Sequence, residues 1–252
     1  MPLRTRALAL LLLALTACTS GPIAWDDDAA AVTAPPTPPV VDPPADSARC
    51  PGSLVATRSG GDEYAAWWRA RTDGSAALVA AHRARGAAWD APVLVDSADQ
   101  SHDGCDRPPP AAAADSASGY VHLVYFLVAP EGAGVFFSHS MDRGAMYHSA
   151  VGVVYGDAPS SAAVAARGDT VVVAYEDPGR DPERGVPVIG LAASITAGHI
   201  FETRGVAVTS GDTPSTNPAI ALAPGGRLTV WWDERGARGG PPQRRARSGR
   251  LR

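Results

Sequence analysis

The first side chains that suggest chemistry in this sequence are potential metal ligands. One stretch combines carboxylates with an imidazole: Asp96, Asp99, His102, Asp103 and Asp106. Such hard oxygen ligands suit Ca²⁺, but their spacing matches no defined calcium loop. We interpret the stretch as a solvated connection, since isolated motif-like clusters often bind nothing.

The histidines show no spacing typical of a metal site, such as His-x3-His. Five of them are interpreted as ordinary strand or turn residues: His82, His122, His139, His148 and His199. The sequence also lacks a Gly-x-Ser-x-Gly motif, a phosphate-binding loop and a Cys-x-x-Cys pair. We therefore predict no metal site and no cofactor.

A polar turn closed by an aromatic residue recurs in the chain. The best copy lies in residues 138–147 and contains Ser140, Asp142, Gly144 and Tyr147. Two degraded copies, 82–89 and 194–201, keep a glycine (Gly86, Gly198) and an aromatic residue three positions later (Trp89, Phe201). The glycines lie 58 (144 − 86) and 54 (198 − 144) residues apart. Repeats of this length are typical of propellers or solenoids.

The sequence between the turns predicts strands. Short apolar runs precede and follow each turn, and a Pro-containing link leads to two further runs that end in aromatic residues, such as 120–126, 170–175 and 227–232. Runs rich in Val and aromatic residues, bounded by Gly, Pro and Asp, favour strands, and no window has a capped helical stripe. Four strands per repeat indicate an all-β fold made of propeller blades.

The pattern Ser-x-Asp-x-Gly-x-x-aromatic resembles the Asp-box of sialidases and related BNR-repeat propellers, with Tyr147 where the family usually has tryptophan. The resemblance implies a partial sialidase-like β-propeller of four-stranded antiparallel blades. In that family the boxes stabilise blade turns far from catalysis. We therefore expect Ser140 and Asp142 to bind turn amides, Gly144 to supply backbone freedom and Tyr147 to pack between strands.

The resemblance also implies a catalytic set, which this chain does not visibly retain. Sialidases use a tyrosine nucleophile with a glutamate, an acid/base aspartate and three arginines that clamp the substrate carboxylate. Arg107, before Pro108-Pro109, is the only candidate for the first clamp, and an arginine in a Pro-rich link is the favoured interpretation. Tyr175 and Glu176 are adjacent and should project to opposite faces of a strand, unlike the family's pair.

The N-terminus predicts export and a lipid anchor. Residues 1–17 have a basic start and an apolar run too short to cross a bilayer as a helix. The ending Leu15-Thr16-Ala17-Cys18 resembles the bacterial lipoprotein box, in which the cysteine is lipidated; an ordinary secretory peptide is the alternative. Thr19 is not the aspartate that retains lipoproteins in the inner membrane, so we expect the outer membrane or the cell surface.

Residues 18–48, with runs of Asp and Pro, are interpreted as an extended tether that spaces the folded part from the lipid. The other two cysteines, Cys50 and Cys105, occupy nearly equivalent places, 18 residues before Trp68 (68 − 50) and 20 before Tyr125 (125 − 105). Equivalent points on adjacent blades are neighbours and the compartment is oxidising, so we predict a Cys50–Cys105 disulfide.

The C-terminus reverses the charge of the folded part. Residues 49–234 carry 13 Arg and 21 acidic residues, a net charge of 13 − 21 = −8, which argues against nucleic-acid binding. Residues 235–252 are rich in Arg, Gly and Pro and are predicted to be disordered, in place of a final outer hairpin. The count is then about three and a half blades, and we hypothesise a truncated or frame-shifted longer propeller, because propellers avoid exposed edges by closing.

Together these features predict a lipid-anchored surface protein that acts as a non-catalytic binding module. By resemblance its ligand is a glycan or a surface protein, met at the central face where Asp106, Arg107, Asp157 and Asp212 precede innermost strands. The alternative is an exo-sialidase or related glycoside hydrolase. A product without a function of its own is a third possibility.

Overall fold

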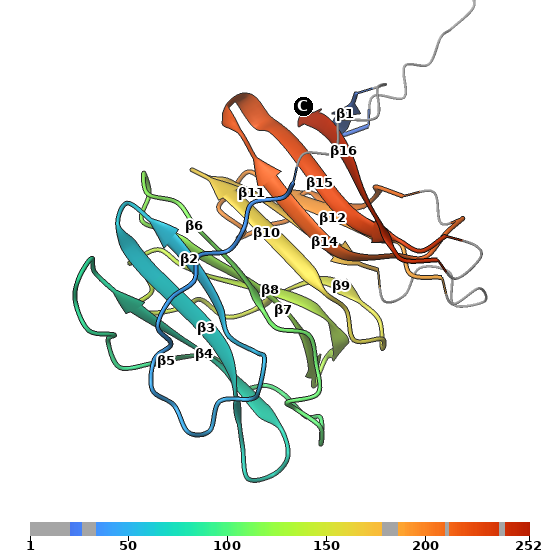
Figure 1. Ribbon diagram of the computed structural model, residues 1–252. Helices are drawn as coiled ribbons and strands as arrows, with labels where there is room; N and C mark the ends of the chain where they lie inside the picture. The colour runs from blue at the N-terminus through green and yellow to red at the C-terminus, as the bar shows by residue number, and fades with distance from the viewer. Residues whose placement is uncertain (1–20, 27–33, 178–185, 210–211, 237–239) are drawn as a thin grey trace, which may run out of the picture.

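A computed structural model describes residues 21–26, 34–177, 186–209, 212–236 and 240–252. It contains four antiparallel sheets of four strands each, arranged side by side (Figure 1). In these residues the only helical element is one short 3-10 turn, η1 (Pro224–Gly226). None of the described segments forms a helix of the length and apolar character needed to span a membrane.

Each sheet is one blade, and its strands follow one another from the innermost to the outermost. The first blade comprises β2 (Val55–Ser59), β3 (Asp62–Ala70), β4 (Ala76–Arg83) and β5 (Val93–Asp96). The second comprises β6 (Ala111–Ala114), β7 (Val121–Ala129), β8 (Gly132–Ser140) and β9 (Val151–Tyr155). The third comprises β10 (Ala162–Arg167), β11 (Thr170–Glu176), β12 (Ile189–Ser194) and β13 (Thr203–Ala207). The fourth comprises β14 (Ser215–Leu222), β15 (Arg227–Glu234), β16 (Gln243–Leu251) and β1 (Ile23–Trp25).

In the second and third blades the middle strands β7, β8, β11 and β12 are mostly apolar, because both of their faces are buried. Successive side chains of a strand point to opposite faces. In β7, Leu123 and Tyr125 enter the core shared with the first blade, whereas Val124 enters the core shared with the third. In β11, Val173 faces the second blade and Val172 faces the fourth. The blades are therefore held together by three apolar seams.

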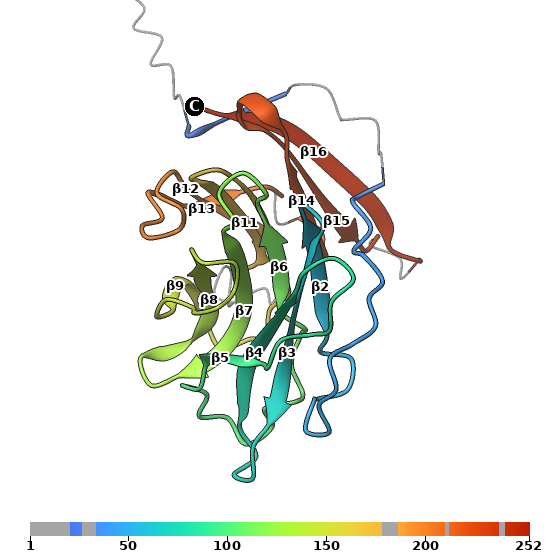
Figure 2. The same ribbon diagram turned by 90° about the vertical axis from the view of Figure 1, so that its left-hand side faces the viewer.

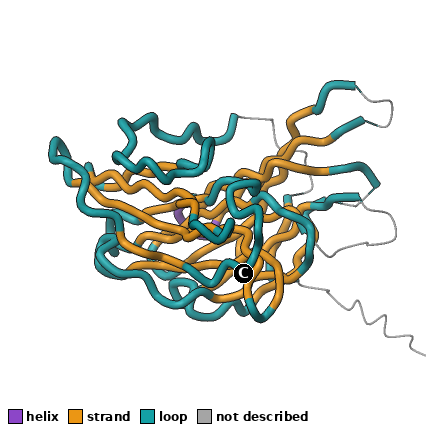
Figure 3. Tube along the Cα trace, turned by 90° about the horizontal axis from the view of Figure 1, so that it is seen from below, coloured by secondary structure: helices purple, strands orange, loops and turns teal. Residues whose placement is uncertain are grey.

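The innermost strands β2, β6, β10 and β14 adjoin one another in chain order (Figure 1). Viewed from below, the strands lie in the middle of the molecule and the loops gather at the two ends (Figure 3). One end carries the links that precede the innermost strands. The other end carries the turns that follow those strands and the turns before the outermost strands.

The prediction of a disordered tail over residues 235–252 is wrong for half of its length, because Gln243–Leu251 forms β16, which pairs along the whole of β15. Cross-strand ion pairs explain why an arginine-rich segment forms a strand here: Arg244 Nη1 lies 3.0 Å from Asp233 Oδ1, and Arg245 Nε lies 2.9 Å from Glu234 Oε2. Opposite charges across neighbouring strands favour pairing. The fourth sheet thereby has four strands, and the described residues form four blades instead of three and a half.

The interpretation of residues 18–48 as a free tether also needs correction. Ile23–Trp25 forms β1, the outermost strand of the fourth blade, which pairs with β16. Arg247 places its guanidinium 4.4 Å from the centroid of the Trp25 ring, an arrangement that favours the attraction between a cation and an aromatic face. The two ends of the described chain thus meet in one sheet.

Residues 34–48, here called the strap, lie against the first blade (Figure 2). Trp89 Nε1 donates a hydrogen bond of 2.8 Å to the carbonyl of Asp42, and Trp67 Nε1 donates one of 2.7 Å to Asp46 Oδ2. Trp67 is fully buried. The strap therefore helps to cover the face of the first blade that has no neighbouring blade among the described residues.

The three turn glycines occupy matching corners, as the repeat predicts. Gly86, Gly144 and Gly198 join the third strand of a blade to its outermost strand, and their φ angles are 73°, 84° and 91°. Gly198 also touches the preceding blade, because a Cβ at this position would lie 2.1 Å from Cε1 of Phe137. The turn of one blade is therefore part of the seam with its neighbour.

Replacing Gly198 by alanine is expected to lower the free energy of unfolding by about 3 kcal/mol or more, since it adds overpacking to the strain of a left-handed residue. Gly205→Ala is the matched control: its φ is 65°, but nothing lies within 4 Å of the new Cβ, so only about 1–2 kcal/mol of strain is expected. Urea unfolding followed by tryptophan fluorescence measures both. Equal losses in the two variants would contradict the packing argument.

Candidate functional site

The Asp-box of the second blade forms the hydrogen bonds that the resemblance implies. Gly144 N donates to Ser140 Oγ (2.8 Å) and Met146 N donates to Asp142 Oδ1 (3.0 Å). Ser140 Oγ–H donates to Asp142 Oδ1 (2.6 Å), and these bonds keep the pKa of Asp142 below its usual value. Tyr147 packs against the seam between the first and second blades. These residues therefore stabilise a turn and are not candidates for a catalytic or ligand-binding role.

The degraded box of the third blade repeats this network with a hydroxyl in place of the carboxylate. Gly198 N donates to Ser194 Oγ (3.1 Å), and Ile200 N donates to Thr196 Oγ1 (3.1 Å). Phe201, at the closing aromatic position, is buried in the seam with the second blade. The interpretation of both segments as copies of one turn is confirmed.

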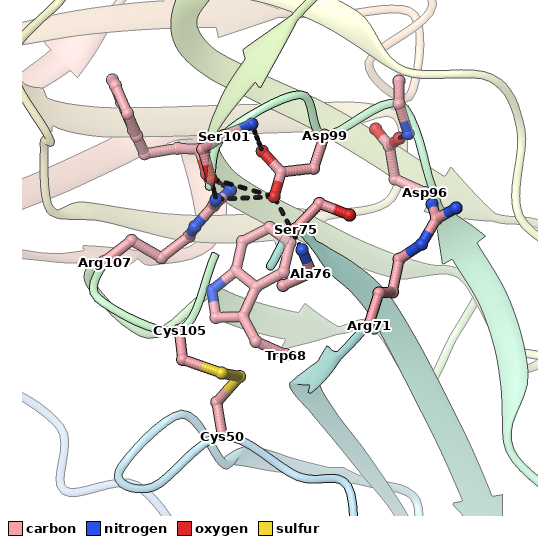
Figure 4. A network of polar contacts seen from close by, with 12 residues as sticks. Cys50, Trp68, Arg71, Ser75, Ala76, Asp96, Asp99, Ser101, Cys105 and Arg107 are labelled. Atoms are coloured by element: carbon pink, nitrogen blue, oxygen red, sulfur yellow. Dashed lines mark hydrogen bonds and ion pairs between the residues drawn. A yellow bond between two sulfur atoms is a disulfide. The ribbon is translucent and has the colours of Figure 1, made fainter. Parts of the chain in front are cut away.

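The predicted disulfide between Cys50 and Cys105 is confirmed (Figure 4). It joins the segment before β2 to the segment before β6, with a Cα–Cα distance of 5.2 Å. Cys50 is buried in the seam between the first two blades. The bond therefore ties together equivalent points of adjacent blades.

Arg107, the candidate substrate clamp, lies in an internal network beside this disulfide (Figure 4). Its Nη2 is 2.7 Å from Asp99 Oδ2 and 2.6 Å from Ser101 Oγ, and its Cζ stands 4.7 Å from the centroid of the Trp68 ring. The side chains of Arg107 and Asp99 are 4% and 0% exposed. A guanidinium in this position holds a loop and is not presented to a ligand, so the structure contradicts the clamp assignment.

The remaining members of the acidic stretch are spread along the same connection. Asp96 Oδ2 accepts a hydrogen bond from the Tyr125 hydroxyl (2.7 Å), and burial together with this carboxylate raises the pKa of Tyr125 well above its usual value. His102, Asp103 and Asp106 are exposed. Within the described part of the chain these carboxylates form no cluster suited to a metal ion.

The aspartates predicted to bind a ligand all precede innermost strands, as expected from the repeat. Asp106 lies before β6, Asp157 before β10 and Asp212 before β14, and all three are exposed. They therefore share one end of the propeller. Arg107, the cation predicted to join them there, is instead held in its internal network. None of the three lines the groove or the charged pocket described below.

A groove of 330 Å³ runs over the innermost strands and is lined mainly by small apolar residues. The strap contributes Pro36–Pro39, and the four innermost strands contribute Val55, Ala56, Thr57, Ala111, Ala112, Ala162, Ala163, Val164, Pro218, Ala219 and Ile220. Among these described lining residues none carries an ionisable side chain.

A charged pocket of 540 Å³ lies at the end of the first blade opposite to the disulfide. It was not predicted from the sequence. It is lined by Arg58, Glu63, Arg83 and Arg85, together with Gly61, Gly86 and Ala87. Arg58 stands opposite Glu63 across β2 and β3, and Glu63 stands opposite Arg83 across β3 and β4. This cross-strand register is the signal that could have revealed the pocket, and it becomes visible only after the hairpins are aligned.

Glu63 holds two of the three arginines in place. Its Oε1 accepts a hydrogen bond of 2.5 Å from Arg58 Nε, and its Oε2 accepts one from Arg83. Burial acts to raise the pKa of Glu63, but its bonds to Arg58 and Arg83 outweigh this and keep the pKa below its usual value. Arg83 also stacks on Trp89, with its Cζ 4.5 Å from the ring centroid. Arg85 forms no ion pair with the described residues, so the pocket has an excess of two positive charges (3 − 1).

The fold is that of a β-propeller built of four-stranded antiparallel blades. No protein-family model matches the chain, and no curated protein matches it. Among solved structures, the Hadza microbial sialidase Hz136 is similar to it, with 15% identity and a TM-score of 0.52 over 77% of this chain and 43% of that one.

Two further structures are similar to the same degree. A Penicillium chrysogenum alpha-L-arabinanase complexed with arabinobiose has 13% identity and a TM-score of 0.52 over 81% of this chain and 64% of its own. A protein of unknown function from Dyadobacter fermentans has 15% identity and a TM-score of 0.53, over 76% and 64%. This chain therefore spans less than two thirds of each, and the likeness establishes the fold alone.

The internal role of Arg107 leads to a stability prediction. Arg107→Met keeps much of the apolar stem over Trp68 but leaves Asp99 buried without its cation, which should lower the free energy of unfolding by about 3–5 kcal/mol. Adding Asp99→Asn removes the uncompensated charge and should recover part of this loss. Urea unfolding of wild type, single and double variants measures both effects. A single variant as stable as wild type would contradict the network.

Proposed function

We propose that the chain is a non-catalytic surface module that binds acidic glycans in the charged pocket of the first blade, here called the arginine pocket. The observation that carries this proposal is the convergence of Arg58, Arg83 and Arg85 on one open pocket around the single carboxylate of Glu63. Arginine offers a planar, permanently charged fork that matches a carboxylate with two parallel hydrogen bonds. A sugar that carries a carboxylate has the complementary chemistry.

The pocket is preorganised for such a ligand. Arg83 is restrained by both Glu63 and the Trp89 ring, and Arg58 also donates a hydrogen bond of 3.1 Å to the carbonyl of Val40 in the strap. Side chains that are already ordered lose less conformational entropy on binding. Arg85 supplies the cation whose charge no described carboxylate offsets.

The absence of ionisable side chains in the described lining of the inner-strand groove favours binding over hydrolysis. Arg107 is likewise committed to Asp99 inside the protein, with a side chain 4% exposed. Hydrolysis of a glycoside needs a positioned acid and a base or nucleophile beside the bond. The fold similarity to a sialidase and to an arabinanase supports a glycan as the ligand class, and it keeps a glycoside hydrolase as the alternative.

Titration of the protein with sialylated and uronate-containing oligosaccharides tests the pocket. We expect Arg85→Ala to weaken binding about tenfold or more, because a charge-assisted hydrogen bond contributes about 1.5–3 kcal/mol. Arg167→Ala removes an exposed arginine from the third blade and should leave the affinity unchanged. Equal binding of neutral oligosaccharides, or an unaffected Arg85→Ala variant, would contradict the proposal. Turnover of a fluorogenic sialoside would favour the hydrolase instead.

We also infer that Cys18, which lies outside the described residues, carries a lipid. The box-like sequence before it supports this inference, and β1 begins at Ile23, so a lipid there would place the outer edge of the fourth blade close to the bilayer. The full chain expressed in a bacterium with lipoprotein processing should partition into the detergent phase of Triton X-114. Cys18→Ser should move it to the aqueous phase, and an unchanged distribution would argue for an ordinary secretory peptide.

A further inference from the structure

Three histidines that are distant in the sequence converge at the junction of the second and third blades. His139 lies near the end of β8, His148 follows the Asp-box of the same blade, and His199 belongs to the degraded box of the third blade. Their potential ligand nitrogens all lie within 4.8 Å of one another. The absence of a metal-like spacing in the sequence therefore does not exclude a metal site.

The backbone accounts for this convergence. His139 lies two residues after Phe137 on β8, so both point toward the third blade. Gly198 lies against the Phe137 ring, and this close approach brings the next residue, His199, over His139. His148 N donates a hydrogen bond of 2.9 Å to the carbonyl of His139, which fixes the imidazole of His148 beside that of His139.

The three rings lie against one another. The centroids of His139 and His148 are 4.5 Å apart at an interplanar angle of 22°, and the His199 ring stands nearly perpendicular to His139, also at 4.5 Å. Nitrogens bound to one tetrahedral ion at about 2.0–2.1 Å are about 3.3 Å apart. His148 and His199 are exposed, so their side chains are free to rotate, close this gap and turn a nitrogen toward the ion.

One nitrogen of this histidine cluster is buried and lacks a partner. The His139 residue is 2% exposed, and its Nε2 is buried without a hydrogen-bond partner among the described residues. Buried polar atoms in native proteins are nearly always satisfied, and the binding of an ion is one recognised reason for an exception. Burial and the neighbouring His148 and His199 also lower the pKa of His139 to about 4, which keeps its imidazole neutral near pH 7.

We propose that His139, His148 and His199 bind one divalent zinc-class transition-metal ion. Imidazole suits Zn²⁺, Ni²⁺ and Cu²⁺, whereas Ca²⁺ and Mg²⁺ prefer oxygen ligands. Three protein ligands leave a fourth position for water or for an oxygen of a bound molecule. The ion links the Asp-box turns of two adjacent blades, so it should stabilise their seam. This proposal is independent of the arginine pocket, which lies on the first blade.

The test uses the full chain, purified without a polyhistidine tag and stripped with a chelator. Calorimetric titration with Zn²⁺ is expected to show one ion per chain. A Zn²⁺ concentration about a hundredfold above Kd should raise the unfolding temperature by several degrees, because the ion binds only the folded site. Titration with Co²⁺ should produce the intense visible absorption of a four-coordinate complex.

Variants separate this site from adventitious binding. His148→Gln and His199→Gln replace exposed side chains and should each weaken Zn²⁺ binding by about a hundredfold or more, with an unchanged circular dichroism spectrum. His102→Gln, which removes an exposed histidine from the first connection between blades, is the matched control and should bind Zn²⁺ like wild type. Equal binding by all four proteins, or the weak spectrum of hydrated Co²⁺ with wild type, would overturn the proposal.

Discussion

The apolar seams between adjacent blades are the constraint on which the rest of this structure depends. The middle strands of the second and third blades have a neighbouring blade on each face, so each of them must supply apolar side chains in both directions. The cross-blade contact of Trp68 with Tyr125, whose ring centroids are 5.8 Å apart, shows how one seam is filled. The disulfide, the Arg107–Asp99 pair and the box turns all stand at the margins of such seams. Their bonds therefore stabilise the contacts between blades and are not directed at a ligand.

The ends of the arc need a different solution, because a seam requires two blades. On the first blade the strap supplies polar partners for Trp67 and Trp89, two large rings at the face without a neighbour. On the fourth blade both ends of the described chain add strands, and charged cross-strand pairs hold the arginine-rich strand in register. Segments with the composition of linkers thus become structural elements when an unpaired edge stands beside them.

The repeat explains which features could be predicted from the sequence. Strand runs, turn glycines and the cysteine pair all follow from a period of about 55 residues, because equivalent positions of neighbouring blades meet. The tail was misassigned because composition alone does not reveal that Asp233 and Glu234 stand across from it. Arg107 was named as a candidate clamp and central-face residue because a short motif says nothing about burial, and Asp99, its partner, had been interpreted as solvated.

The same reasoning explains why the histidines escaped prediction and where binding chemistry should concentrate. A local spacing rule tests only one strand or loop, whereas His139 and His199 are neighbours because their blades are neighbours. Relative to the box glycines, they lie five residues before Gly144 (144 − 139) and one residue after Gly198 (199 − 198). Box turns are held rigid by side-chain hydrogen bonds and pressed against the adjacent blade. Side chains that they carry from two blades are therefore fixed relative to each other, as a metal site requires.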